Sequence, residues 1–169
     1  KKVRTTKSVG SLKDIYVLLD AGHGGNDPGS SGNGVVEDEV AYDIMVRIKK
    51  LLEEQYGATV YPFIEDKKTQ FVPQTRLRKG NDEVVLTNPE YHTGDVHTAV
   101  NLRAYKANHL YHKLTRSGIS ADNIVFLSVH TDALDTHAQG MMIYYPDAKL
   151  RKDLRKSGRY LDYKEVSAN

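Results

Sequence analysis

A histidine in a glycine-rich turn is the first feature of this sequence that could support chemistry. Residues 15–19 form a short apolar run that Asp20 closes, and His23 follows within the stretch Ala-Gly-His-Gly-Gly. Glycines let the backbone curl tightly, so the imidazole can point into a crevice above the strand end. A phosphate-binding loop is the competing interpretation, but the turn has neither a Gly-Lys-Ser/Thr ending nor the spaced glycines of a dinucleotide site.

A carboxylate and a second histidine could complete a metal-binding set with His23. Glu37 opens a helical pattern beside Asp38 and Glu39, whose simplest role is to complement the positive end of the helix dipole. His130 follows the apolar residues 124–129. One histidine at a strand end is usually structural, but two with a carboxylate between them make a plausible three-ligand site. Because the chain has no cysteine, histidine and carboxylate side chains must hold any zinc.

Strand and helix patterns alternate along the sequence and would position these residues. This alternation predicts an α/β fold, with an open and mostly parallel sheet and helices on both faces. Continuous apolar runs indicate strands buried on both faces, and spacings of three and four indicate amphipathic helices. Strands are predicted at residues 15–19, 59–64, 124–129 and 141–145, and helices from Asp38 to Gly57 and from Val100 to near Gly118. In such folds ligands bind beyond the carboxyl ends of strands, where His23 and His130 are expected.

Length and charge narrow the class of protein. A chain of 169 residues is long enough for one hydrophobic core and short for two, so one domain is expected. With 24 basic and 22 acidic residues the net charge is only +2, which gives no reason to expect nucleic acid as a partner. We expect no transmembrane segment, because no apolar run approaches the roughly 18 residues that a membrane-spanning helix needs. The basic start at Lys1 is not followed by the apolar part of a signal peptide.

Four motifs, in order along residues 15–145, resemble the zinc-dependent N-acetylmuramoyl-L-alanine amidases of the amidase-3 family. They are Gly22-His23-Gly24-Gly25, Gly34-Val35-Val36-Glu37, Arg103-Ala104-Tyr105-Lys106-Ala107-Asn108 and Ser128-Val129-His130-Thr131-Asp132. The resemblance implies that His23, Glu37 and His130 bind Zn²⁺, with water in the fourth position. It also implies that Arg103, Asn108 and Asp132 contact substrate or support the ligands. Asp132 stands where the family usually has asparagine.

The function implied by this resemblance is hydrolysis of the amide bond between N-acetylmuramic acid and L-alanine in peptidoglycan. The bound zinc would polarise the carbonyl and lower the pKa of its water towards about 7. The protein would then act in the bacterial cell envelope, periplasmic or secreted, with a protein activator as a possible further partner. The alternative is a non-catalytic peptidoglycan-binding or regulatory module that retains the zinc site.

Two departures from the family pattern concern the insertion and the general base. Residues 66–97 are polar, aperiodic and longer than the family's connection, so we interpret them as an insertion that lies near the metal and regulates access. The family's general base is a glutamate on a late strand, and residues 1–169 include no such segment. We therefore expect an incomplete domain with the base beyond Asn169, since Glu165 lies in a polar run without strand pattern.

Overall fold

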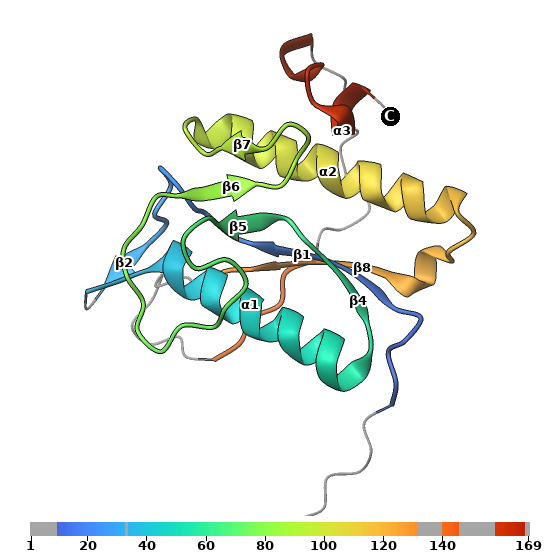
Figure 1. Ribbon diagram of the computed structural model, residues 1–169, viewed down its shortest axis with the longest axis horizontal. Coiled ribbons are helices and arrows are strands. Elements are labelled where there is room, and N and C mark those ends of the chain that lie inside the picture. Colours follow the sequence, from blue (N-terminus) through green and yellow to red (C-terminus); the bar gives the residue numbers. More distant parts are fainter. Residues whose placement is uncertain (1–9, 33, 132–139, 146–157, 168–169) are drawn as a thin grey trace, which may run out of the picture.

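A three-stranded parallel sheet forms the centre of the computed structural model, which describes residues 10–32, 34–131, 140–145 and 158–167 (Figure 1). The strands are β1 (Tyr16–Ala21), β4 (Thr59–Pro62) and β8 (Ile124–Val129), in the order β4-β1-β8. β1 pairs with a strand on each edge and α1 packs against it, and Leu19 in its apolar run is fully inaccessible. The predicted α/β fold is confirmed.

Two long helices, α1 (Glu37–Tyr56) and α2 (Val96–Arg116), lie on opposite sides of this sheet (Figure 1). Both were predicted, and both begin slightly earlier than the sequence pattern indicated. Helix α1 ends at Gly57, whose φ of 74° lies in the left-handed region that glycine adopts without a Cβ penalty. Asp95 caps the start of α2, where its side chain accepts a hydrogen bond from the Thr98 amide and so satisfies one free donor of the first turn.

Short antiparallel strands flank the central sheet. β5 (Ile64–Asp66), β6 (Glu83–Val85) and β7 (Tyr91–His92) form one small sheet, and β2 (Ser31–Gly32) pairs with β3 (Val35–Val36) just before α1. The strand predicted at residues 59–64 is therefore divided into β4 and β5. Residues 66–97 contain β6 and β7, which the sequence did not reveal because strands of two or three residues are too short to show a period.

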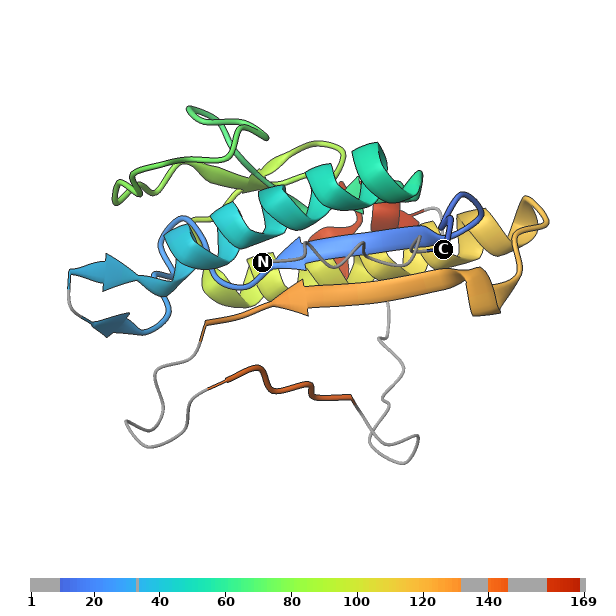
Figure 2. The ribbon, with the colours of Figure 1, turned by 90° about the horizontal axis from the view of Figure 1, so that it is seen from below.

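Two sequence-based predictions about strands are wrong. Among the described residues β8 has a strand partner on one side only, and Val125, Phe126 and Leu127 are 41–50% exposed instead of buried. Residues 141–145 form no strand, and Met141 and Tyr145 are almost fully exposed. Figure 2 shows this segment as an irregular trace apart from β8. An apolar run becomes a strand only where a neighbouring strand supplies backbone hydrogen bonds, and the run alone does not specify that neighbour.

The remaining elements are short. η1 (Ala121–Asn123) leads into β8, and η3 (Gly158–Tyr160) precedes α3 (Lys164–Ser167), which packs against α2. Within the described residues, neither long helix has an apolar stretch sufficient to span a bilayer.

Candidate metal centre

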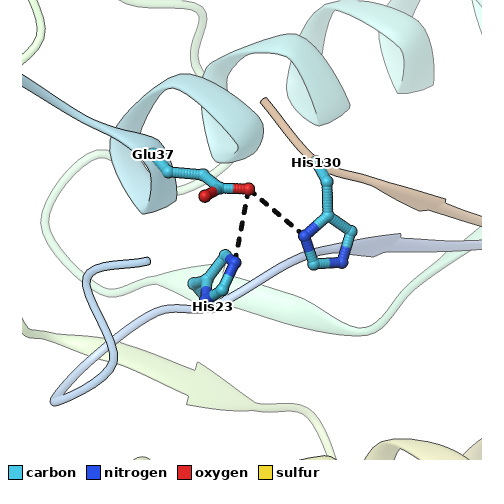
Figure 3. Close-up of side chains that lie close together, drawn as sticks. All are labelled: His23, Glu37 and His130. Carbon is cyan, nitrogen blue, oxygen red and sulfur yellow. Dashed lines mark hydrogen bonds and ion pairs between the residues drawn. The ribbon is translucent and has the colours of Figure 1, made fainter. Parts of the chain in front are cut away.

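His23, Glu37 and His130 meet where β1 and β8 end and α1 begins (Figure 3). Glu37 Oε1 lies 3.3 Å from His23 Nε2 and 3.2 Å from His130 Nδ1. The two imidazole rings are nearly perpendicular, with centroids 5.0 Å apart. One ligand atom from each of the three residues lies within 4.8 Å of the others. The three side chains therefore form a candidate metal site.

Glycines around this site make room for the three side chains. A Cβ on Gly22 would lie 2.2 Å from His130 Cε1, and one on Gly29 would lie 2.7 Å from His23 Cδ2 and 2.8 Å from Glu37 Oε2. His23 itself has a φ of 64°, an uncommon backbone conformation for a residue other than glycine. These glycines therefore have a second role besides allowing a tight turn. Because they lack a Cβ atom, they leave the space that the ligand side chains occupy.

The Glu37 carboxylate is held by hydrogen bonds on both oxygens. The Ser30 amide and hydroxyl donate to Oε2 at 3.0 and 2.9 Å, and the Thr131 amide donates to Oε1 at 3.0 Å. Burial by itself would raise the pKa of Glu37, but these hydrogen bonds and the nearby His23 lower it to about 2. Glu37 is therefore ionised at neutral pH, as a metal-binding carboxylate must be.

The lowered pKa of Glu37 predicts a specific loss of stability in acid. The folded-state pKa lies below the ordinary value of 4.5, so the stabilisation is complete above that value and is lost as pH falls towards about 2. Because a tenfold change in proton affinity is worth about 1.4 kcal/mol, the full effect is roughly 3 kcal/mol. Glu37→Gln should remove this part of the acid dependence when the metal-free chain is unfolded by denaturant at a series of pH values.

Glu54→Gln is the matched control, because Glu54 is exposed on the same helix. It should leave the acid dependence of the unfolding free energy unchanged. If Glu37→Gln and Glu54→Gln gave the same pH profile, the hydrogen-bonded carboxylate would not be the source of the effect.

A second layer of polar side chains supports His23. Asp27 Oδ2 lies 3.0 Å from His23 Nδ1, the ring nitrogen that faces away from Glu37. Arg103 donates to the His23 carbonyl oxygen, and its Nε lies 3.6 Å from Asp20 Oδ1. Asp20 Oδ2 in turn accepts a hydrogen bond of 2.8 Å from the Ser128 hydroxyl. A carboxylate on the outer nitrogen of a metal-binding imidazole fixes its orientation and increases its basicity.

The other residues singled out in the sequence lie in different places. Arg103 and Asn108 line a cleft of about 530 Å³ that also reaches His23 and His130. Asp132 falls outside the described residues. Glu165 lies in α3, where its Oε2 accepts a hydrogen bond of 3.0 Å from the Asn88 amide, and α2 lies between α3 and the central sheet (Figure 1).

Sequence reasoning assigned no role at this site to Asp20, Asp27, Ser30, Ser128 or Thr131. Ser128 and Thr131 lie inside a family motif, and for the other three the only signal was that each lies within eight positions of a proposed ligand. Their partners depend on how the turn after β1, the hairpin β2-β3 and the end of β8 meet in space.

Part of the 66–97 segment borders the turn that carries His23. The Gly25 amide donates to Glu83 Oε2 at 2.7 Å, and the Asn26 amide donates to the Thr93 carbonyl at 3.2 Å. The Asn26 side chain also donates to the Gly94 carbonyl at 3.1 Å. Residues 66–97 therefore contact the turn that carries His23. That they control access of substrate to the metal site stays a prediction.

Comparison with known proteins identifies the class of this chain. A family model described as N-acetylmuramoyl-L-alanine amidase matches residues 17–167, so the chain belongs to that family, the amidase-3 family suggested by its motifs. The chain is 35% identical over 65 residues to an endolysin of Bacillus phage SPP1, a match covering 38% of this chain and 24% of the endolysin.

The name of a second relative states the amidase activity of the family. The chain is 36% identical over 42 residues to a sporulation-specific N-acetylmuramoyl-L-alanine amidase of Bacillus subtilis (strain 168), a match covering 25% of this chain and 16% of that amidase. The chain thus matches a quarter or less of the length of either relative. No solved structure matches it.

Proposed function

We propose that this chain is a zinc-dependent amidase domain that hydrolyses the bond between N-acetylmuramic acid and L-alanine in peptidoglycan. The observation that carries the proposal is the convergence of His23, Glu37 and His130 on one point beside an open cleft. Membership of the amidase family supports the substrate class. The corresponding site of action is the bacterial cell envelope, periplasmic or secreted.

The donor set fits zinc better than other common metals. Two imidazole nitrogens and one carboxylate are a typical ligand set of catalytic zinc, in which a fourth position remains open. Glu37 is ionised, and Asp27 stands behind His23 to hold its ring. When bound here, zinc supplies a Lewis acid for the scissile carbonyl and activates a water molecule for attack.

The chain's own residues orient the ligands and shape the substrate cleft. Arg103 fixes the His23 turn through its carbonyl oxygen, so its role is positional. Val100, Ala104 and Phe126 contribute apolar surface to the cleft, and the exposed Asn108 also lines it, where its amide can hydrogen-bond to substrate. Apolar walls with a few polar groups are typical of sites that bind small organic groups.

A non-catalytic peptidoglycan-binding module remains the second candidate, and the position of Glu165 favours it. This glutamate accepts a hydrogen bond from the Asn88 amide, on an element that packs against the far side of α2. A general base typically contributes on the order of 100-fold to 10,000-fold, so a domain without one would bind zinc and substrate but hydrolyse slowly. We assign no general base among the described residues.

Zinc removal separates the two candidates. Zinc-loaded protein incubated with purified peptidoglycan should expose new L-alanine amino termini, measurable by amine labelling and mass spectrometry of the released stem peptides. Chelation should lower that rate by at least about 100-fold, since a metal's Lewis acidity is worth several kcal/mol, and added zinc should restore it. Binding of peptidoglycan by the zinc-loaded protein without release of stem peptides would instead establish the module.

A further inference from the structure

A second cluster of carboxylates lies beside the candidate zinc site but shares none of its ligands. Asp38 and Glu39 in the first turn of α1 and Glu83 in β6 each offer a carboxylate oxygen within 4.8 Å of the others. All three are buried, with exposed fractions of 3%, 9% and 2%. The helix dipole explains acidic residues in a first turn, but it does not explain why a third carboxylate from a distant strand joins them.

One oxygen of this cluster has no hydrogen-bond partner in the described part of the chain. Glu83 Oε1 is fully buried and unpaired, although Glu83 Oε2 accepts from the Gly25 amide. The free oxygen lies near Glu39 Oε1, because a Cβ built on Gly80 would lie 3.9 Å from the first and 3.4 Å from the second, which accepts a hydrogen bond from the Gly80 amide. Asp82 Oδ1 lies 2.9 Å from that same position.

The charges of His23 and Lys79 act on Asp38, but neither side chain forms an ion pair with the cluster. Lys68 Nζ lies 2.8 Å from Asp82 Oδ1, and the Lys68 side chain is mostly exposed. Within the described residues, no lysine, arginine or histidine forms an ion pair with Asp38, Glu39 or Glu83 at 4.0 Å or less. Burying an unpaired carboxylate is costly, and three together repel one another as well. Burial, together with the charges of Asp38 and Asp66, raises the pKa of Glu83.

We propose that Asp38, Glu39 and Glu83 form a second cation site, which takes a hard divalent cation of the calcium class. All the donors are oxygens, which disfavours zinc and favours calcium or magnesium. Calcium binds oxygen at about 2.3–2.6 Å, and carboxylate oxygens within 4.8 Å of one another can share one such ion. Magnesium needs about 2.0–2.1 Å and a near-octahedral shell and gives up its water reluctantly, so a site made of three protein carboxylates suits calcium better.

The place of this site in the fold gives it a structural role. Glu83 binds the Gly25 amide, two residues from His23, and Asp38 and Glu39 follow Glu37 directly. A cation here holds β6, the His23 turn and the start of α1 together. This inference does not depend on amidase activity, because it concerns binding and stability.

Calcium binding to the zinc-loaded protein tests the proposal. Isothermal titration with calcium chloride should give one site beyond the zinc site, and a 100-fold excess over its Kd should raise the melting midpoint by about 5 °C or more. Magnesium chloride should bind more weakly. If the zinc-loaded protein shows neither calcium binding nor a calcium-dependent shift, the cluster holds protons instead of a cation and the proposal is wrong.

Glu83→Gln keeps the size of the side chain and removes its charge. Without calcium this variant should melt at the same temperature as the parent or higher, because a repulsive charge is gone. Its affinity for calcium should fall at least tenfold, and the calcium-dependent shift in melting should disappear. Glu54→Gln, an exposed change on α1, should retain both. Full calcium affinity in Glu83→Gln would overturn the assignment even if the parent binds calcium.

Discussion

His23→Ala and His130→Ala are each expected to abolish zinc binding at micromolar metal and to lower stem-peptide release by at least about 100-fold, as chelation does. Each change removes one of three ligands and leaves Glu37 with a single imidazole beside it. The loss of several kcal/mol of charge stabilisation corresponds to a factor of this size. Bound zinc is measured by elemental analysis after dialysis, and release by the amine-labelling assay on purified peptidoglycan.

The fold should survive both substitutions. His23 and His130 lie past the ends of their strands and are 22% and 46% exposed in their side chains, outside the hydrophobic core. His112→Ala is the matched control, because His112 is exposed on α2 and belongs to no metal cluster among the described residues. It should retain zinc and activity. Wild-type hydrolysis by either ligand variant would refute the metal site, and so would full zinc content.

Gly22→Ala is expected to weaken zinc binding by roughly 10-fold to 100-fold, the range seen when the support of a metal ligand is disturbed. The new Cβ would lie 2.2 Å from His130 Cε1 and 2.5 Å from His130 Nδ1, so the imidazole must move away from Glu37. The overlap is with a side chain that can rotate, so the cost in stability should be only about 1–3 kcal/mol. Zinc affinity is measured by competition with a chelator, and stability by denaturant unfolding.

Gly32→Ala is the control for the loss of a glycine. Gly32 lies in β2, is exposed, and has no atom within 4 Å of the position that a Cβ would take. Its zinc affinity should stay within a factor of two or so of the parent, since surface changes away from special features usually have small effects. Equal zinc affinities in the two alanine variants would mean that Gly22 does not make room for His130.

The sequence by itself determined the family, the three proposed ligands and most of the main elements. These features are local, because a glycine turn after an apolar run, a helical repeat and a histidine after a second apolar run can each be recognised within about 20 residues. The alternation of strands and helices then predicts a parallel sheet. In that sheet β1 and β8 run in the same direction, so His23 and His130 lie beyond the same ends of their strands. The prediction that the two histidines lie together is confirmed by their geometry.

Only the tertiary structure decided which groups surround those ligands. β8 carries the apolar run of a central strand but has one strand neighbour among the described residues, because its own composition does not specify what pairs beside it or packs on its faces. Glu83 lies in a stretch without periodicity, so nothing local indicated that its carboxylate would reach the Gly25 amide 58 positions earlier in the chain. Hydrogen bonds and charge pairs of this kind join distant segments, and their geometry is set by packing that a sequence pattern does not contain.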